Sequence, residues 1–377
     1  MLRFPIQLNG VALGTCGLGL LLANIVQSTH IIQGESIIRV VVVTTTSLSI
    51  CFLVVYIFCN VLLQGPRVWL QRELNSPHQC SAFGALIMHL SLIAYILVNY
   101  IPFGSPSFYI SHILGYFAAI IQILNMTLCG YLLRCIAVKE KLSLLSLIEP
   151  YFNPVIHSIT MSAIGIPGDN DFAIFLRSIL TGIGICLLLP STLTQAYRVL
   201  NDDAIANDTS IALLQAAPSM VLVGWLLVPT VTIYNLESTV AHILFIYASV
   251  FYVATIYAIV RRRKRLAQSM KHFTLSSFTF PFVNTANATI IYFDRNYNNK
   301  FDSFPLYWSM RIYSLILAVL AICIVLYVLS VYTSRGLFLS SSSIIDNDEN
   351  DDIIMHEARE SDDDDTPKTQ ITVFVKV

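Results

Sequence analysis

Charged residues are scarce in this sequence. Only 12% of its 377 residues are Asp, Glu, Lys or Arg, which is about half the roughly 25% usual for soluble domains. Hydrophobic residues make up 55%. A soluble domain of this length needs a polar surface that so few charges cannot supply. The composition therefore excludes an ordinary soluble protein and predicts one embedded in a lipid bilayer.

Cysteine pairs and metal-binding motifs are also missing. The eight cysteines fall inside apolar runs without a CxxC pair, and no two histidines stand at metal-ligand spacing with a carboxylate. The absence of these motifs argues against a disulfide framework, a metal site and a cofactor. Catalytic motifs such as GxSxG and HExxH are absent as well, so we do not expect an enzyme.

The few charges are distributed unevenly. Residues 336–377 hold 11 acidic residues but only three basic ones, whereas residues 1–335 hold 19 basic and 12 acidic residues, a net charge of +7. The chain is thus predicted to have a basic, apolar transmembrane domain at 1–335 and an acidic tail at 336–377. The tail has too little apolar content to fold, so we expect a disordered cytoplasmic segment.

Long apolar runs without charge are abundant. A bilayer core of about 30 Å requires about 20 apolar residues per helix, and ten runs approach this length, the fifth being the shortest. We therefore predict an all-α polytopic membrane protein with ten transmembrane helices. The first span is not interpreted as a signal peptide, because no A-x-A-like cleavage site follows it. The expected spans are residues 4–26, 38–63, 77–99, 109–136, 152–166, 171–197, 211–229, 239–260, 273–293 and 310–334.

Lys and Arg mark one side of the membrane. They gather in the connections from even to odd spans, whereas the odd-to-even connections near residues 30, 100, 168 and 233 contain none. Because basic loops stay cytoplasmic, we expect both termini in the cytoplasm of a plasma-membrane protein. The basic run 261–265 is either a topology determinant that contacts anionic lipid or a phosphate-binding site. We favour the first interpretation and expect no nucleic-acid partner.

Prolines recur in the odd-numbered spans at intervals of 63 to 77 residues. This interval corresponds to one helical hairpin, so the chain is predicted to contain five repeats of a proline-bearing helix followed by a plainer one. Proline kinks a helix, and a membrane tolerates the freed carbonyl groups only where they meet protein or water. Five such helices predict the lining of a central pore. The expected kinks are at Pro5, Pro77, Pro154, Pro218 and Pro281.

The odd spans are also the polar ones, although they contain no Asp, Glu, Lys or Arg. A pathway lined by hydroxyl and amide groups offers weak sites that an ion can leave, whereas coupled pumps usually keep an ionisable group at mid-membrane depth. Each polar side chain, taken singly, is also explained by a helix-packing hydrogen bond. The candidate pore-lining residues are Asn9, Thr15, Ser81, His157, Ser158, Ser162, Ser219, Asn284 and Asn287.

Two spans carry more specific patterns. In the first, Gly10 and Gly14 predict close helix packing, since the order of the glycines is not that of a nucleotide-binding loop. In the ninth, Phe280, Asn284 and Asn287 fall on one helical face. If that face looks into a lumen, Phe280 would plug a pathway lined by amide groups. If it looks at another helix, Phe280 is simply a core residue.

The odd spans together resemble a known family. The strings FPIQLNGVALGTCGLG, SPHQCSAFGAL, EPYFNPVIHSITMSAIG, LLQAAPSMVLVGW and SSFTFPFVNTANATI resemble the tellurite-resistance/dicarboxylate transporter family. That family includes TehA-like bacterial proteins, slow-type anion channels of plant guard cells, and fungal malate permeases and sulfite exporters. The resemblance covers roughly residues 3–335.

The resemblance implies a ten-helix protomer in which five inner helices surround a central pore with quasi-fivefold symmetry. It also implies a homotrimer with one pore per protomer, an anion pathway without charged lining, and a phenylalanine of the ninth helix that occludes it. The family pattern Phe/Tyr-Ser/Thr-Phe-Pro/Gly matches residues 278–281 here. It therefore assigns the gate to Phe280, with Phe278 as the alternative in a shifted register.

The resulting prediction is a membrane channel or facilitative transporter for small anions, either inorganic or organic-acid anions. A proton-linked malate/C4-dicarboxylate permease or a sulfite exporter is the alternative within transport. In that case His89 and His157 would be the proton carriers, although a packed neutral histidine is the simpler role. A heptahelical signalling receptor is the alternative of another class, and ten spans with both termini on one side argue against it.

Overall fold

The computed structural model describes residues 8–29, 35–74, 77–100, 106–140, 144–168, 170–201, 210–228, 234–263, 276–297 and 304–334. The chain divides into two units, one of residues 4–331 and one of residues 1–3 with 332–377. Only residues 332–334 of the second unit are described, so the acidic tail lies outside the described residues. Pro5, in the first unit, also lies outside them.

The described part of the first unit is helical apart from short turns and loops, with ten long helices that correspond one by one to the expected spans. The all-α polytopic fold is confirmed. The long helices are α1 (Leu8–Thr29), α2 (Glu35–Ile57), α4 (Pro77–Tyr100), α5 (Pro106–Glu140), α6 (Leu144–Gly165), α7 (Asp171–Asn201), α8 (Leu213–Leu227), α9 (Tyr234–Arg261), α11 (Ser276–Tyr297) and α12 (Phe304–Ser334). The short ones are the π-helix η1 (Phe58–Leu62), α3 (Pro66–Glu73) and the 3₁₀-helix η2 (Ser210–Ala212).

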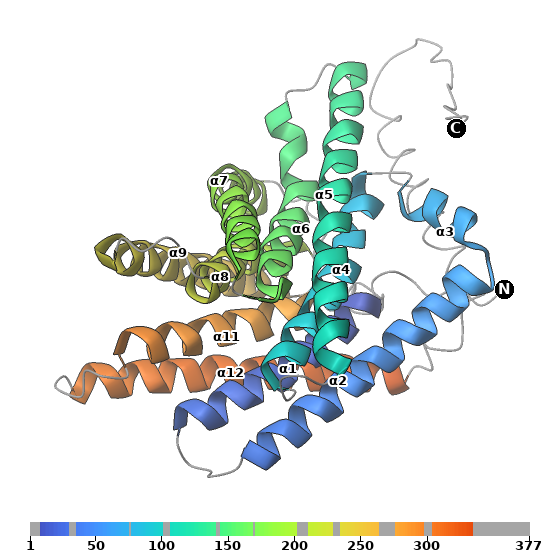
Figure 1. The fold of residues 1–377 in the computed structure, drawn as a ribbon. Coiled ribbons are helices and arrows are strands. Elements are labelled where there is room, and N and C mark those ends of the chain that lie inside the picture. The colour runs from blue at the N-terminus through green and yellow to red at the C-terminus, as the bar shows by residue number, and fades with distance from the viewer. Residues whose placement is uncertain are drawn as a thin grey trace. The chain divides into compact units, whose positions relative to one another are not determined.

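Five of the long helices form a closed ring. Helix α1 packs on α4, α4 on α6, α6 on α8, α8 on α11, and α11 returns to α1. In Figure 1 these helices follow one another around the middle of the ribbon. They are the odd-numbered spans of the sequence, and we call them the inner ring.

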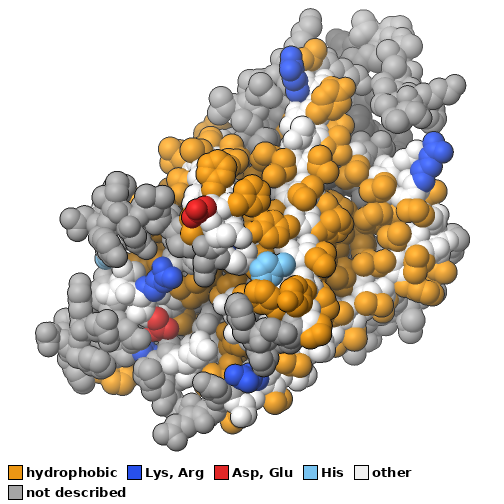
Figure 2. Space-filling model, viewed as in Figure 1, with side chains coloured by type: hydrophobic (Ala, Val, Ile, Leu, Met, Phe, Trp, Pro, Cys, Tyr) orange, Lys and Arg blue, Asp and Glu red, His pale blue; other side chains and the backbone are white. Residues whose placement is uncertain are grey.

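The even-numbered spans, α2, α5, α7, α9 and α12, are the outer helices. Helix α2 packs mainly on α1, α5 on α4 and α6, α7 on α6 and α8, and α9 on α8. Each outer helix leaves a row of large hydrophobic side chains exposed. Figure 2 shows that such side chains cover most of the face formed by α2 and α5. A surface of this kind is suited to lipid and not to water.

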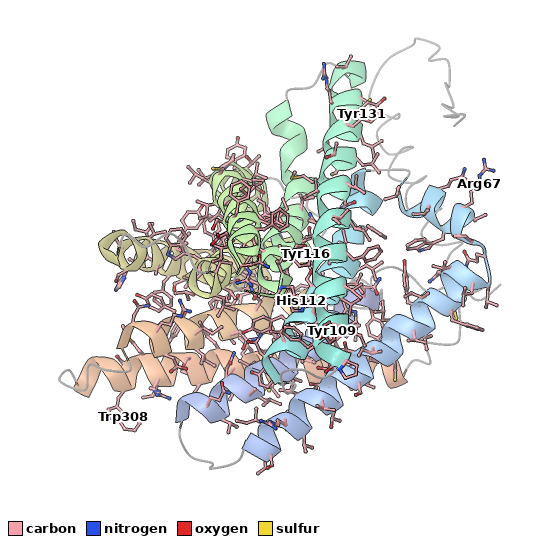
Figure 3. All side chains as sticks on the ribbon, in the orientation of Figure 1. Arg67, Tyr109, His112, Tyr116, Tyr131 and Trp308 are labelled. Atoms are coloured by element: carbon pink, nitrogen blue, oxygen red, sulfur yellow. The ribbon has the colours of Figure 1, made fainter. Side chains whose placement is uncertain are left out.

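Two tyrosines of α5 mark the two edges of this apolar surface. Tyr109 and Tyr131 project outward near opposite ends of the helix (Figure 3) and are 67% and 64% exposed. The 22 residue steps from Tyr109 to Tyr131 span about 33 Å of helix, close to the roughly 30 Å of a bilayer core. Tyrosine prefers the membrane–water interface because its apolar body ends in a polar hydroxyl group.

Hydropathy distinguishes three helices of the inner ring from the other long helices. Among the described residues, seven helices are long and apolar enough to cross a membrane, namely α1, α2, α4, α5, α7, α9 and α12. Helices α6 and α8 provide only shorter apolar stretches, Val155–Gly165 and Leu213–Leu227. Together with α11 they belong to the inner ring, where polar residues lower the hydropathy. The count of ten spans therefore stays a prediction, whereas a multi-pass membrane protein is established.

Three local features differ from the sequence-based expectation. The segment after the second span forms the short helix α3, which starts at Pro66 after Gly65, a residue with a φ of 91° that favours glycine. Helix α11 continues to Tyr297 and thus contains Asp294 and Arg295, because helical hydrogen bonding does not stop where hydropathy falls. For the same reason α6 begins at Leu144 and includes Glu149.

Candidate functional site

The seam between α1 and α11 is closely packed at glycine. The Thr279 hydroxyl group of α11 donates a hydrogen bond to the Gly10 carbonyl oxygen of α1 at 2.9 Å. A Cβ atom added to Gly14 would lie 2.5 Å from both Cβ and Oγ1 of Thr279. Glycine is therefore required for this approach, and the prediction of close packing at this motif is confirmed.

Phe280 rests on the same seam. Its Cδ2 and Cε2 atoms lie 3.7 and 3.8 Å from the place where a Cβ atom on Gly17 would be. The side chain is 7% exposed and belongs to a large apolar cluster that includes residues of the inner ring and of the outer helices α2, α7 and α9. Val283 Cγ1 lies nearer still, at 3.0 Å, so the phenyl group and Val283 together occupy the space that Gly17 leaves empty.

Phe278 points to a different side of α11. Its ring stacks on that of Phe282, with centroids 6.5 Å apart, and Phe282 meets Tyr252 of α9 edge-on at 6.0 Å. Phe278 and Phe282 therefore face an outer helix, whereas Phe280 faces α1.

The remaining face of α11 can be located from its neighbours. Thr279 and Val283 contact α1, and Thr285 contacts α8. Helical periodicity places Phe280, Asn284, Asn287 and Ile291 between these two sides and opposite the outward-facing Phe282. We call this face the inner sector of α11. It contains the residues that the sequence aligned on one face.

The two asparagines of the inner sector form hydrogen bonds with neighbouring helices. The Asn284 Nδ2 atom donates to Ser219 Oγ of α8 at 3.2 Å, and the Asn287 Nδ2 atom donates to the Gly17 carbonyl oxygen at 3.4 Å. Asn24 of α1 donates to Asn287 Oδ1 at 3.0 Å. Each amide nitrogen carries two hydrogens, and each of these bonds uses one. The seam therefore presents a series of neutral N–H donors.

Ser219 is the hydroxyl group that joins α8 to α11. It accepts hydrogen bonds from Asn284 and, at 3.1 Å, from Thr285 Oγ1, while its own hydrogen can be donated to the Gln215 carbonyl oxygen at 2.8 Å. It directly follows Pro218, whose missing N–H loosens the backbone of α8 at this level. The proline and the hydroxyl group together allow α8 to meet α11 through polar contacts.

The predicted residues of α6 have separate environments. Ser162 lies 3.5 Å from Ser91 of α4, so it belongs to the α4–α6 contact. Ser158 bonds to the Val155 carbonyl oxygen of its own helix at 3.0 Å. His157 hydrogen-bonds the backbone of Ala216 on α8, and its Nε2 atom is buried without a partner.

Three further candidates are on helices other than α11, and the side chain of one of them is not described. Thr15 donates to the Val11 carbonyl oxygen of its own helix at 2.9 Å. Asn9 is buried, and its Nδ2 atom has no partner. The side chain of Ser81 lies outside the described part of α4.

The prolines of the odd spans have different places in their helices. Helix α4 begins at Pro77, a position where the missing N–H breaks no helical hydrogen bond. Pro154, Pro218 and Pro281 lie within helices. The outer helix α7 also contains a proline, Pro190, so the expectation that even spans are plainer is wrong for this helix.

His89 is placed between α4 and the outer helix α2. Its Nε2 atom hydrogen-bonds Ser49 Oγ of α2, and its Nδ1 atom is buried without a partner. The two histidines proposed as proton carriers therefore lie in different contacts, one with an outer helix and one within the inner ring. Among the described residues, no three His, Cys, Asp or Glu side chains gather as metal ligands.

Sequence reasoning missed two arginines. Arg177 in α7 is only 9% exposed and donates to the carbonyl oxygen of Gly168 in the loop that precedes the helix. Arg295, in the last turn of α11, is near enough to Tyr95 of α4 for their charges to interact. A lone arginine inside an apolar run was the available signal for Arg177. The position of Arg295 depends on the length of α11, which hydropathy underestimates.

A comparison with protein families matches residues 3–333 to the family described as voltage-dependent anion channel. No curated protein and no solved structure shows a detectable similarity to the chain. The match covers nearly the whole transmembrane domain and agrees with the resemblance of the five odd spans to the tellurite-resistance/dicarboxylate transporters. This is a family of anion channels and transporters and not of enzymes. With a closed ring of polar helices inside an apolar shell, the chain is a member of the voltage-dependent anion channel family.

Proposed function

We propose that the protein conducts small anions, inorganic or carboxylate, through the inner ring, and that Phe280 is its gate. One observation carries the proposal: Phe280 lies over Gly17 on the inner sector of α11, and the amide groups of Asn284 and Asn287 follow it along the same face. A phenyl group covers about 150–250 Å² when buried. Because Gly17 has no side chain that could fill the gap, loss of the phenyl group would open the space beside α1.

Selection for anions would come from neutral donors and from charge at the cytoplasmic side. The amide hydrogens of Asn24, Asn284 and Asn287 offer anions weak binding sites that permit release. Arg261 and Arg263 are exposed at the end of α9, on the side that the loop charges assign to the cytoplasm. Such a basic surface raises the local concentration of anions.

Proton-linked transport of malate, another C4-dicarboxylate or sulfite is the second candidate, and His157 is the observation that favours it. Its Nε2 atom is buried within the inner ring and has no partner, so a proton could be added there together with an anion. The test is to measure reversal potentials of the reconstituted protein under chloride, nitrate, sulfite and malate gradients at two pH values. A pH-dependent shift that disappears in His157→Gln would favour the carrier.

The proposal includes a homotrimer with one pathway per protomer in the plasma membrane, with both termini in the cytoplasm. The distribution of Lys and Arg in the loops supports this orientation. Cysteines introduced at Thr230 and Thr366 are expected to react with an impermeant thiol reagent from opposite sides. Reaction of both from the same side would contradict the topology.

The gate is tested by comparing two phenylalanines of one helix. Phe280→Ala is expected to raise anion conductance well above wild type, because the phenyl group is the bulkiest side chain of the inner sector. Phe278→Ala is the matched control, since this side chain faces Phe282 and α9. It should leave conductance unchanged and lower stability by about 3–5 kcal/mol.

The outcomes separate the rival mechanisms. Strong conductance in Phe278→Ala with none in Phe280→Ala would move the gate by two residues. If both variants reach the membrane and neither conducts, the protein is a carrier whose rate depends on a conformational cycle and not a gated channel.

A further inference from the structure

Three buried methionines occupy equivalent places on three consecutive helices of the inner ring. Met88 on α4, Met161 on α6 and Met220 on α8 are all buried, and all belong to the same apolar cluster as Phe280. Among the described residues, α1 and α11 contain no methionine. The thioether side chains are therefore confined to one side of the ring.

The contacts of α6 and α8 place two of them on the inside. On α6, Ser162 faces α4 while His157 faces α8, and Met161 lies between these directions. The opposite side of α6, with Val155 and Ile159, belongs to a separate apolar cluster with the outer helices α5 and α7. Met161 is thus turned away from the outer helices.

Met220 has a corresponding position on α8. Ser219 faces α11, and Gly224 lies against Thr160 of α6. Met220 falls between these two directions, whereas Val221 turns toward Gly184 of the outer helix α7. Ser219 bonds to Asn284, which lies about one helical turn after Phe280 on α11. Met220 directly follows Ser219, so it lies at about the level of Asn284, one turn beyond Phe280.

Met88 completes the set on α4. Ser91 faces α6, and His89 faces the outer helix α2. Met88 lies between these two directions and nearer to that of Ser91, and it belongs to the same cluster as Met161 and Met220. The three side chains therefore face the seam between α1 and α11, which carries the amide groups.

We infer that Met88, Met161 and Met220 form a second, apolar constriction beyond Phe280, which we call the methionine collar. An apolar constriction blocks ions by excluding water, even where its radius would admit them. Methionine suits this role because its unbranched side chain changes rotamer readily and can move aside as the gate opens. The inference rests on the proposed function, because it concerns the same pathway. It predicts that removing Phe280 opens the pathway only in part.

The test adds polarity to the collar without changing its size. Met161→Gln and Met220→Gln are made in the Phe280→Ala variant, and anion conductance is compared with Phe280→Ala alone. Glutamine has nearly the length of methionine but binds water, so each double variant should conduct several-fold more. In the presence of Phe280 the same substitutions should have little effect on anion conductance, because an anion must pass both Phe280 and the methionine collar.

Two controls isolate the location and the chemistry. Met161→Leu keeps the position apolar and should leave the conductance of Phe280→Ala unchanged. Met126→Gln changes a partly buried methionine of the outer helix α5, and it should also have no effect. A rise with Met126→Gln equal to that with Met161→Gln would overturn the collar.

A chemical test replaces the substitutions if the glutamine variants fail to fold. Hydrogen peroxide transfers one oxygen atom to a thioether sulfur, which becomes a sulfoxide, and leaves as water. Treatment should raise the current of Phe280→Ala, and the rise should vanish when Met88, Met161 and Met220 are all replaced by leucine. No rise, or a rise that persists in the leucine variant, overturns the collar alone. Absence of current in Phe280→Ala and in every double variant counts against the gate and the collar together.

Discussion

The inner and outer helices of this protein reverse the usual relation between polarity and burial. In the most apolar windows of α1 and α4, 72% and 61% of the positions are buried, whereas in those of α2, α5, α7, α9 and α12 the share is 28–33%. Nevertheless amide and hydroxyl groups are common on the well-buried inner helices, and the outer ones are richer in exposed aliphatic side chains. In a membrane the solvent is apolar, so polar groups gather where protein replaces lipid. This contrast predicts different effects for matched substitutions in the two sets of helices.

The largest effect is expected from a charge on an outer helix. Leu124 lies near the middle of α5 and is 63% exposed. Leu124→Asp should oppose membrane insertion by roughly 2.5–3.5 kcal/mol, whereas Leu124→Ala should insert normally. The amount of membrane-integrated protein is the measurement. Normal insertion of the aspartate variant would mean that this face of α5 is not in contact with lipid.

The next effect concerns glycine in the two sets of helices. Gly14→Ala should lower stability by about 1–3 kcal/mol, because the new methyl group would overlap Thr279 at the α1–α11 seam. Gly130→Ala on the outer helix α5 meets no atom within 4 Å, so it should be neutral or stabilise by up to about 1 kcal/mol. Denaturation in detergent compares the two. Equal effects would show that the seam is not closely packed.

A smaller effect is expected for hydroxyl groups. Ser219→Ala removes the acceptor of Asn284, and bonds of this kind between membrane helices contribute roughly 0.6–1.7 kcal/mol. Thr127→Ala on α5 is the control, because Thr127 is exposed and bonds only to the Ile123 carbonyl oxygen of its own helix. Its stability should match wild type. A loss equal to that of Ser219→Ala would remove the distinction between inner and outer hydroxyl groups.

No effect is expected from truncation after Arg335, which removes the acidic tail. Its composition predicts no part in the fold or in the pathway, so stability and anion flux should be retained. Altered flux at low salt that returns to normal at high salt would instead indicate attraction between the tail and the basic run 261–265, since such attraction is screened within about 10 Å at 0.1 M salt.

The architecture was largely predictable from the sequence because it depends on patterns that repeat. Apolar runs located the ten long helices, and the alternation of polar and plain spans identified the inner ring. Helix α3 was missed, since its eight residues carry both charged and apolar side chains. The extension of α11 over Asp294 and Arg295 was missed because backbone hydrogen bonds, and not hydropathy, decide where a helix ends.

The candidate site was predictable only in part. The face with Phe280, Asn284 and Asn287 follows from helical periodicity, whereas its partners do not. Asn24 and Ser91 take part because neighbouring helices approach closely, and this approach depends on glycines at the contact, such as Gly165 against Ser91. His89 was grouped with His157 because both lie in odd spans, but Ser49 of α2 holds His89 on another side of its helix.

The bond from Thr279 to Gly10 joins residues 269 positions apart, and this separation has a consequence for synthesis of the protein. At about 5–20 residues per second, α1 leaves the ribosome roughly 15–50 s before its partner α11 is made. During that interval the side of α1 that packs on α11 has no partner. The inner ring consists only of α1, α4, α6 and α8 and stays open. The proposed gate, Phe280, and the helix that closes the ring therefore arrive together, so in the proposed mechanism the nascent protein cannot form a finished pathway before it also contains the side chain that blocks it.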